Sequence, residues 1–431
     1  MKILKDQTTN RSSDSIWQAT AIPPLQTETL NSDKSCDVAV IGAGYTGLSA
    51  ALHLAKAGKS VVVLEQNHVG YGGSGRNTGM VNSGIWVDPD EVISTIGMIA
   101  GTRLNQALAH SNVTVFDIIK RHGIPCHATQ NGSINLAFKG EDEAKLQNRC
   151  QQMLDLGCNT RFVSAIEAKI LTGADGFYGG LIDENAGTIN PLSYVRGLAK
   201  TAVDAGAMLF ENQNVSMPTR EGERWHVSTN GNTISAAFVI VATNAYTNRL
   251  FPELAQMTIP MPFLHIATDP LGKYFDEVLA DQKCAWDTRS TAFCFRKDPE
   301  GRLILGTIGS VSGGRSSLSR QWAHRQLKKH FPQISGVPVR KAWVGRIGYS
   351  PLHVPQYVKL GEKLIAPLGY NGRGIGPGTV FGRNLAEYFL SGFDQNILYL
   401  PLSQPKSVKL RILRAKVFDL GATGLRFLGR R

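Results

Sequence analysis

The sequence predicts an α/β fold built around a parallel sheet, because it opens with a strand–turn–helix–strand unit and continues with further short apolar runs. Residues 37–41 (DVAVI) and 60–64 (SVVVL) are rich in β-branched residues, as buried strands are. Between them, residues 48–57 place apolar side chains at helical spacing until Gly58 ends the helix. A unit of this kind requires a parallel strand pair with a right-handed connection.

Later segments extend this pattern and add a mixed middle region. Residues 133–138 alternate like a strand, and residues 141–156 have helical spacing. Residues 191–205 predict a helix with Pro191 in its first turn. Further strands are predicted at 208–211, 238–242, 303–306 and 363–366, and a further helix at 377–390. With 431 residues, the chain is long enough for two domains.

Composition is typical of a globular α/β enzyme. Hydrophobic residues make up 42% and charged residues 19% of the chain, which excludes a disordered or fibrous protein. No apolar run reaches the roughly 18 residues of a membrane helix, and the polar residues 1–20 lead us to expect no secretory leader. The six cysteines form no CxxC pair and no histidine cluster has zinc spacing. We therefore expect a cytoplasmic protein with mostly buried free thiols and no metal site.

The net charge of +12 is concentrated at the carboxyl end, where residues 406–431 hold eight basic residues against the single acid Asp419. Because the basicity is local, we expect no nucleic-acid partner. In a helix the apolar residues of this tail would form a stripe with a cationic surround. Two interpretations stay open: a peripheral contact with an anionic inner-membrane surface, or a helix docked on its own domain. The stripe consists of Val408, Leu410, Leu413, Val417 and Leu420.

Residues 42–47 (GAGYTG) form a GxGxxG turn between the first strand and its helix. The first glycine permits the tight turn, the second lets the backbone approach a pyrophosphate, and the third lets helix and strand pack closely. Glu65 follows at the end of the next strand, where a carboxylate accepts hydrogen bonds from ribose hydroxyls. This context predicts a Rossmann-like dinucleotide site. Its expected contacts are Gly42, Gly44, Tyr45, Thr46, Gly47, Glu65 and Gln66.

The turn alone does not separate NAD from FAD, but two further glycine-rich segments bear on the choice. One is residues 70–79 (GYGGSGRNTG), and the other is residues 369–378 (GYNGRGIGPG), which lead into a predicted helix. Together these pieces resemble the D-amino-acid-oxidase-type flavoproteins, which include glycine oxidase and sarcosine oxidase. Within that family the chain is most similar to the γ-glutamylputrescine oxidoreductase-like branch. The resemblance spans about residues 14–395, with an ASGRN-type motif at 73–77 and a YNGRG-type motif at 370–374.

The resemblance implies FAD as cofactor. The first motif would wrap the isoalloxazine and pyrophosphate, and the second would bring a helix N-terminus to the flavin pyrimidine ring. Such a helix end favours the negative charge of reduced flavin. No cysteine follows Cys294, so the cofactor is expected to be noncovalent. The implied contacts are Gly73, Ser74, Gly75, Arg76, Asn77, Val215, Ala242, Asn244, Tyr370, Asn371, Gly372, Arg373 and Gly374; Arg373 has the alternative of capping a neighbouring helix.

The resemblance also implies a discontinuous division of the chain. An N-terminal arm (1–35) would precede a Rossmann-like FAD-binding domain (36–90, 161–248 and 343–395). An antiparallel-sheet α+β substrate domain (91–160 and 249–342) would cover the flavin, and a basic tail (396–431) would follow.

Substrate-pocket candidates lie in or near that second domain. A substrate carboxylate would need a cation, ideally a bidentate arginine, and Arg289 and Arg296 are candidates. Residues 343–355 resemble a WxGxxxxTPDxxP stretch of the family, but Leu352 replaces its Asp and Ser350 its Thr. Tyr349 and His353 flank that position and are further candidates. The other aromatic and basic candidates are His265, Tyr274, Trp286, Phe293 and Phe295.

The resemblance implies an enzyme that takes a hydride from a carbon next to nitrogen in a small amine or amino acid and passes it to flavin N5. The imine product would hydrolyse to a carbonyl compound, and oxygen or a quinone would accept the electrons. The expected substrates are γ-glutamylated polyamines, N-alkyl glycines or D-amino acids. Two alternatives remain: oxidation of a 2-hydroxy acid on the same scaffold, and nucleotide binding without catalysis.

Overall fold

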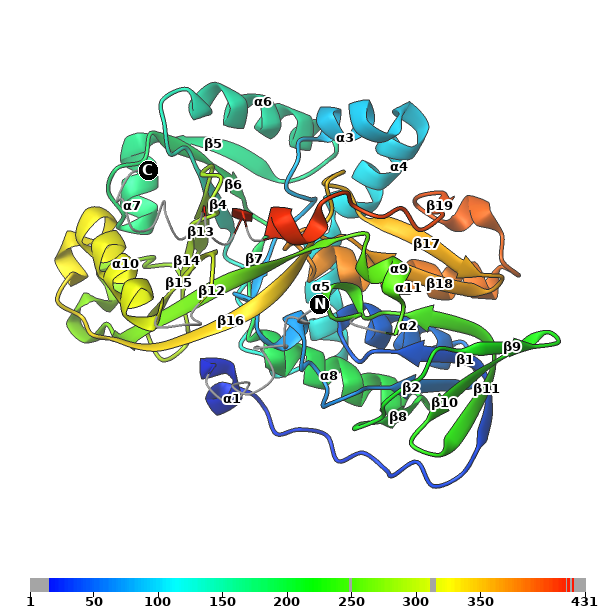
Figure 1. The fold of residues 1–431 in the computed structure, drawn as a ribbon. Helices are drawn as coiled ribbons and strands as arrows, with labels where there is room; N and C mark the ends of the chain where they lie inside the picture. The colour runs from blue at the N-terminus through cyan, green and yellow to red at the C-terminus, as the bar shows by residue number, and fades with distance from the viewer. Residues whose placement is uncertain (1–14, 248–249, 311–314, 416, 419–420, 422–431) are drawn as a thin grey trace.

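The computed structural model of the chain describes residues 15–247, 250–310, 315–415, 417–418 and 421. Its strands form two large sheets and one two-stranded sheet, with helices around them (Figure 1). The long strands β12 (Ile259–Pro270) and β16 (Val339–Tyr349) run side by side from the second large sheet toward the first (Figure 1). Among the described residues, no helix has the length and apolar character needed to span a membrane.

The first sheet is centred on β1 (Lys34–Ile41), which pairs in parallel with β2 (Val61–Leu64) and β11 (Asn232–Val241). Helix α2 (Tyr45–Lys56) connects β1 to β2, which confirms the predicted βαβ unit. The strand order is β19-β17-β18-β11-β1-β2-β8, and β10 and β9 continue from β11. The other strands are β8 (Met208–Phe210), β9 (Thr219–Glu221), β10 (Arg224–Thr229), β17 (Gln356–Gly361), β18 (Leu364–Leu368) and β19 (Leu402–Ser403).

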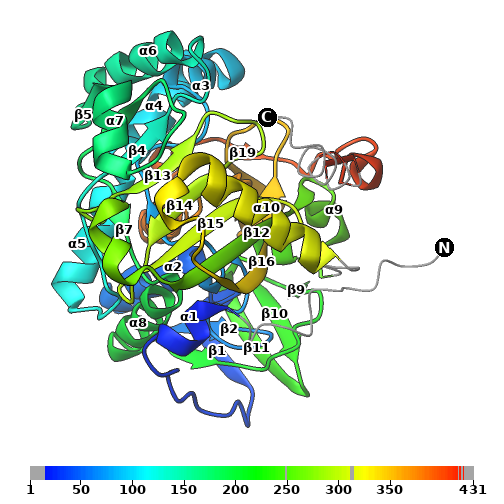
Figure 2. The ribbon, with the colours of Figure 1, turned by 90° about the vertical axis from the view of Figure 1, so that its left-hand side faces the viewer.

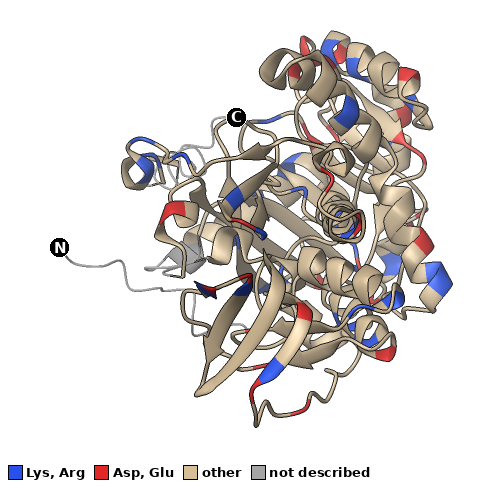
Figure 3. Ribbon diagram, turned by 90° about the vertical axis from the view of Figure 1, so that its right-hand side faces the viewer, with Lys and Arg blue, Asp and Glu red and all other residues tan. Residues whose placement is uncertain are grey.

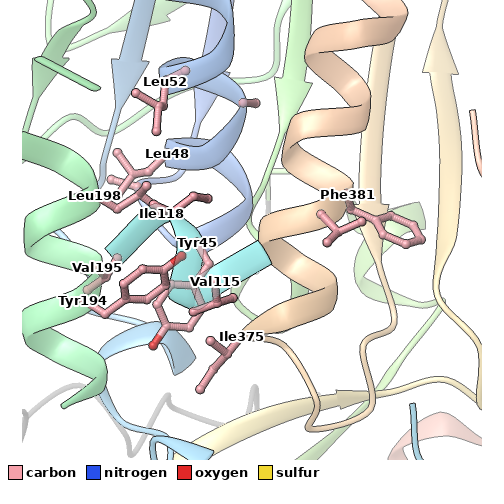
Figure 4. Packing of buried hydrophobic residues seen from close by; sticks show 14 of the residues in the cluster. Tyr45, Leu48, Leu52, Val115, Ile118, Tyr194, Val195, Leu198, Ile375 and Phe381 are labelled. Carbon is pink, nitrogen blue, oxygen red and sulfur yellow. The ribbon is translucent and has the colours of Figure 1, made fainter. Parts of the chain in front are cut away.

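Helix α2 is enclosed by helices from distant parts of the chain. It packs against α8 (Pro191–Asp204) and α11 (Gly376–Leu390), and α5 (Ser111–His122) packs against α11. Figure 4 shows side chains of α2, α8 and α5 pointing toward one another in this core. Leu48, Val115 and Leu198 are fully buried there. This packing holds the N-terminal ends of α2 and α11 in position.

The second sheet has the order β16-β12-β15-β14-β13-β4-β6-β5 and is antiparallel except between β13 and β4. Helix α10 (Arg315–His330) covers one face, where buried side chains of β12, β14 and β15 form an apolar core. The other face contacts the first domain, since the Trp343 indole donates to the Arg76 carbonyl. Its other strands are β4 (Ser133–Leu136), β5 (Thr160–Ser164), β6 (Gly179–Asp183), β13 (Cys284–Asp287), β14 (Cys294–Lys297) and β15 (Arg302–Ile308).

Strand pairing divides the chain differently from the predicted boundaries. Strand β6, and strand β5 apart from Thr160, were expected in the nucleotide domain as part of 161–248, but they pair in the second sheet. Strand β16 lies wholly in the second sheet, although 343–395 was expected in the first domain. Conversely, α5 was expected in the substrate domain and packs into the core around α2. These partners are distant in sequence, so local patterns do not identify them.

The remaining short elements surround the two sheets, with α6 beside α3 in Figures 1 and 2. All six cysteines are buried and free, as predicted for most of them. The elements are α1 (Ile16–Thr20), α3 (Pro89–Ile96), α4 (Met98–Ala109), α6 (Asp142–Asp155), α7 (Ala165–Thr172), α9 (Pro252–Ala255), β3 (Met80–Val81) and β7 (Gly187–Thr188).

Candidate active site

The glycine-rich turn after β1 has a tightly closed backbone. Gly42 has φ +108°, and a Cβ there would lie 3.0 Å from the Ala242 carbonyl oxygen. A Cβ on Gly47 would lie 2.1 Å from the Gly42 carbonyl oxygen, so no larger residue fits. Gly44 is the N-cap of α2, whose first-turn N–H groups have no acceptor within the helix. These donors and the helix dipole make the start of α2 suitable for a phosphate.

Glu65 stands directly after β2, beside this turn. Its Oε2 accepts from the Ala43 N–H at 2.9 Å, and its Oε1 accepts from the Asn67 N–H at 3.0 Å. Burial raises the pKa of Glu65 above its ordinary value, and these two hydrogen bonds oppose the rise. Ribose hydroxyls donating to the same carboxylate would lower that pKa again.

Two other predicted contacts lie farther along this edge of the sheet. Gln66 is exposed, and its side-chain amide donates to the Asn214 side chain at 3.1 Å. Val215 forms an isolated bridge with Thr229 and packs partly buried against the core of the first sheet. Gln66 thus lies next to Glu65 in sequence, and Val215 packs against the strands of the first sheet.

The second glycine-rich segment folds directly onto the first. The Gly70 N–H donates to the Ala43 carbonyl at 3.2 Å, and the Tyr45 N–H donates to Ser74 Oγ at 3.2 Å. The Tyr45 hydroxyl in turn donates to the Ser74 carbonyl at 2.6 Å. A Cβ on Gly75 would lie 2.3 Å from the Gly70 carbonyl oxygen, so the close fold of this segment depends on that glycine.

Asn77 and Arg76 complete this segment. Asn77 Nδ2 donates to the Gly73 carbonyl at 2.9 Å, which holds the short helical turn in place. Arg76 is 8% exposed, its guanidinium lies 4.6 Å from the Tyr71 ring centre, and its Nη2 has no hydrogen-bond partner. Arg76 is thus a buried cation with an unused donor, in the segment whose Ser74 accepts from the first N–H of α2.

The third glycine-rich segment, residues 369–378, forms a late turn that contacts the start of α2. The Tyr370 hydroxyl and Thr46 Oγ1 are hydrogen-bonded at 3.0 Å. A Cβ on Gly382 would lie 2.3 Å from the Thr46 carbonyl oxygen, so α11 crosses α2 in close contact. The Gly369 N–H donates to Asn244 Oδ1 at 3.2 Å, which connects the turn to the end of β11. Figure 4 shows Ile375, at the start of α11, beside Tyr45 and Tyr194.

Asn371 and Gly372 bring this turn against the second sheet. Asn371 has φ +51°, and its Oδ1 accepts from the Ser350 N–H at 2.6 Å. A Cβ on Gly372 would lie 3.1 Å from Cδ1 of Ile347 in β16. The turn therefore lies between the two sheets.

Three glycine-rich segments distant in sequence thus converge on the starts of α2 and α11. These residues fit FAD for three reasons. The glycines let the backbone approach a pyrophosphate closely, and the Glu65 carboxylate lies beside the nucleotide turn, where it could accept hydrogen bonds from ribose hydroxyls. Arg76 also has a buried donor without a partner. Two helix N-termini add positive potential to the same region.

Arg373 is the second buried cation of this region. Its guanidinium lies 4.8 Å from the Trp86 ring centre and 4.3 Å from the Trp286 ring centre, and we call these three residues the arginine clamp. Nη1 donates to the Ser83 carbonyl at 2.9 Å, whereas Nε and Nη2 have no hydrogen-bond partner. Burial lowers the pKa of Arg373 to about 9, so the guanidinium is still charged at neutral pH.

A buried carboxylate, that of Asp183, lies beside the arginine clamp and contacts the same residue, Ser83. Asp183 Oδ2 accepts from Ser83 Oγ at 2.6 Å and from Asn112 Nδ2 at 3.1 Å. Burial raises the pKa of Asp183, and the Arg373 charge contributes a small opposing effect. The carboxylate is therefore held by neutral donors, while two guanidinium nitrogens of Arg373 stay without an acceptor.

The structure gives Arg296 contacts that connect the two domains. Its side chain donates to the carbonyls of Thr78, Gly79, Ile189 and Lys297 at 2.6–3.2 Å. Its Nη1 and Nε are thereby occupied by backbone, so the carboxylate role expected for Arg296 has no support in these contacts.

Arg289 lies on the other face of the second sheet. It forms an ion pair with Asp287 and lies 4.7 Å from the Phe293 ring centre, within the apolar core beneath α10. Its Nη1 donates to Gln326 of α10 at 3.3 Å. Arg289 lies in the turn between β13 and β14, and its contacts with Asp287 and Gln326 hold it on the α10 side of the sheet, away from the glycine-rich segments.

Tyr349 and His353 do come together, beside the late turn. The Tyr349 hydroxyl and His353 Nε2 are hydrogen-bonded at 2.7 Å, and His353 has φ +58°. Burial raises the pKa of Tyr349. Because Ser350 in the same loop binds Asn371, this pair lies at the edge of the candidate site.

Two aromatic features of the site differ from expectation. Trp86 was not singled out from the sequence, since an isolated tryptophan in a loop carries no pattern. His265 is buried and stacks on Trp343 at 5.0 Å, and burial lowers its pKa to about 3. His265 Nε2 lies 3.1 Å from Thr78 Oγ1, so this neutral imidazole connects β12 to the second glycine-rich segment.

Comparisons with known proteins agree with this geometry. The chain is 30% identical over 379 residues to the γ-glutamylputrescine oxidoreductase of Escherichia coli, with 86% of this chain and 88% of that protein covered. It is 28% identical to the probable oxidoreductase OrdL of Haemophilus influenzae, with 96% of each covered. The crystal structure of L-proline dehydrogenase from P. horikoshii shares the fold, with a TM-score of 0.69 and 19% identity over 93% of this chain and 99% of that chain.

The family model described as DAO, FAD dependent oxidoreductase, matches residues 37–388. This range contains the βαβ unit, all three glycine-rich segments and the arginine clamp. The match confirms the resemblance inferred from the motifs and resolves the choice between NAD and FAD. The chain belongs to the DAO family of FAD-dependent oxidoreductases.

Proposed function

We propose that this enzyme oxidises a C–N bond in a small amine that carries a carboxylate: a γ-glutamylated polyamine, an N-alkyl glycine or a D-amino acid. The observation that carries the proposal is the arginine clamp, in which Arg373 is buried, charged and incompletely hydrogen-bonded. The similarity to a γ-glutamylputrescine oxidoreductase supports the same substrate class.

Physical chemistry favours a carboxylate as the partner of Arg373. A buried guanidinium with unused donors loses hydration without full compensation. A carboxylate offers two oxygens in the planar geometry that a guanidinium edge matches. The indoles of Trp86 and Trp286 hold the guanidinium plane, so less conformational entropy is lost when an anion binds.

The chain would hold FAD noncovalently at its three glycine-rich segments. When bound, FAD supplies the two-electron acceptor that takes a hydride from the carbon next to nitrogen. The starts of α2 and α11 favour negative charge at the cofactor. Arg373 would orient the substrate through its carboxylate, and a substrate amine that binds unprotonated needs no side-chain base. Oxygen or a quinone would be the final electron acceptor.

Anaerobic bleaching of the flavin tests the proposal. Each γ-glutamylated amine, N-alkyl glycine and D-amino acid is compared with the matching compound that lacks the carboxylate, and with 2-hydroxy acids. We expect rapid bleaching by at least one carboxylate-bearing amine and at least about 30-fold slower bleaching by its decarboxylated partner. Faster bleaching by 2-hydroxy acids would favour the hydroxy-acid reaction instead. Bleaching by no compound would refute the proposal. Oxygen uptake and quinone reduction by the bleached enzyme then identify the acceptor.

A further inference from the structure

The C-terminal segment docks on the body of the protein through one side only. The Val408 N–H donates to the Gln256 carbonyl at 2.9 Å, and Arg411 Nε donates to the Thr258 carbonyl at 2.7 Å. Phe418 contacts Tyr349, with ring centres 5.5 Å apart. Residues 411–415 and 417–418 are helical. The docked side of this helix thus carries Arg411 and Phe418, seven residues apart and on one face.

The opposite side of the same helix is apolar and uncovered. Leu413 and Val417 are spaced i, i+4 and are 55% and 60% exposed, and Leu410, just before the helix, is 69% exposed. The segment is therefore bound to its own domain, yet it leaves its apolar stripe in solvent. We call Leu410, Leu413 and Val417 the outer stripe; of the predicted stripe, Val408 is partly buried and Leu420 lies outside the described residues. Self-docking accounts for the inner side of the helix and leaves the outer stripe unexplained.

Positive charge borders the outer stripe. Lys406, Lys409 and Arg414 are exposed on the described part of this segment. In Figure 3, Lys and Arg colour this helix at the edge of the molecule, and in Figure 2 the same red helix stands out from the body. Exposed apolar side chains flanked by cations complement a surface with acyl chains below and anionic headgroups above. Leu352, in the loop after Tyr349, adds another apolar side chain that is 50% exposed.

We propose that the outer stripe and its flanking lysines and Arg414 form a surface that binds an anionic lipid bilayer peripherally. The helix would lie parallel to the membrane plane. Its docked side would stay bound to the enzyme body, and its outer stripe would enter the headgroup–acyl boundary. This binding is separate from the chemistry at the flavin, because none of these side chains belongs to the arginine clamp or to the glycine-rich segments.

Cosedimentation of the full flavin-loaded protein with vesicles tests this proposal. The vesicles contain phosphatidylglycerol with phosphatidylcholine, or phosphatidylcholine alone. We expect binding to the anionic vesicles that weakens as salt is raised, and little binding to the neutral ones. The double variant Leu413→Asp, Val417→Asp should reduce binding at least about tenfold, because both charges would enter the apolar boundary.

A matched control comes from α7, where Ile166 and Ile170 have the same i, i+4 spacing and are 75% and 74% exposed. The double variant Ile166→Asp, Ile170→Asp should bind anionic vesicles as the unmodified protein does. Flavin content and melting temperature check that each variant is folded. The proposal is overturned if the intact protein fails to bind anionic vesicles or if both double variants lose binding equally. It is also overturned if light scattering shows that the outer stripe joins two copies of the chain and no vesicle binding occurs.

Discussion

The two regions that meet at the candidate site are built by different means. Around the starts of α2 and α11 the backbone itself forms the site, and added Cβ atoms at Gly47 and Gly75 would lie 2.1 and 2.3 Å from carbonyl oxygens. Around the arginine clamp, side chains form the site, and buried polar atoms such as Arg373 Nε lack partners. The cofactor region is therefore determined by shape, and the clamp by charge. Changes in the first should abolish flavin binding, whereas changes in the second should alter substrate choice while the fold persists.

The largest effect is expected at Gly47. Gly47→Ala places a Cβ in conflict with the Gly42 carbonyl, so α2 must shift away from the nucleotide turn. We expect a protein without flavin, destabilised by more than about 4 kcal/mol. Absorbance of the purified protein and thermal unfolding measure both effects. Gly336→Ala is the control, because no atom lies within 4 Å of the added Cβ. A yellow, stable Gly47→Ala variant would contradict the shape argument.

The next effect is expected at Arg373. Arg373→Gln should lower kcat/KM for a carboxylate-bearing amine at least about 30-fold, which corresponds to about 2 kcal/mol, while flavin content is retained. Arg373→Lys keeps the charge but loses the planar pair of donors, so it should recover only part of the activity. Activity toward the decarboxylated analogue is the control and should change little. An equal loss on both substrates would mean that Arg373 supports structure rather than carboxylate binding.

An effect on stability at acidic pH, rather than on activity at neutral pH, is expected from His265, whose pKa is lowered to about 3 by burial. The unfolded histidine takes up a proton below about pH 6.5, whereas the folded one stays neutral until about pH 3. Folding stability should therefore be complete above about pH 6.5 and fall as pH drops, with a contribution of up to about 1.4 kcal/mol per pH unit. Denaturant unfolding between pH 7 and 4 should show a shallower dependence in His265→Gln. An identical pH dependence in both proteins would exclude His265 as the source.

The smallest effect is expected at the edge of the site. Tyr349→Phe removes the hydrogen bond to His353, which lies in a half-buried loop. Loss of one such hydrogen bond costs about 1 kcal/mol of stability, and kcat/KM should change less than about fivefold. Steady-state kinetics over a range of pH measure this change in kcat/KM. A change as large as that of Arg373→Gln would place Tyr349 in the reaction itself.

The same contrast between the cofactor region and the clamp explains which parts of the site could be predicted from the sequence alone. Gly42, Gly44, Gly47 and Glu65 act within about 25 residues of one another, so their spacing predicts the βαβ unit and the nucleotide turn. The substrate side depends on pairings between distant strands. Sequence patterns do not show that β5 and β6 join the second sheet, nor which side of that sheet is taken by Arg289, in the turn after β13, and by Arg296, in β14.

The arginines show this most clearly. Arg289 and Arg296 carry the right charge in the expected domain, but one pairs with Asp287 beneath α10 and the other binds four backbone carbonyls. Arg373 belongs to a turn identified by its glycines, and its position between Trp86 and Trp286 depends on the approach of three separate segments. Only tertiary structure brings such a clamp together.

One spectroscopic titration tests the central claim that Arg373 and the flavin share a site. A simple carboxylate such as propionate, which has no amine to oxidise, is added to the flavin-loaded enzyme and to its Arg373→Gln variant. We expect a saturable change in flavin absorbance in the first, and binding at least about 30-fold weaker in the variant. No spectral change in the unmodified enzyme, or the same dissociation constant for both proteins, would contradict the account.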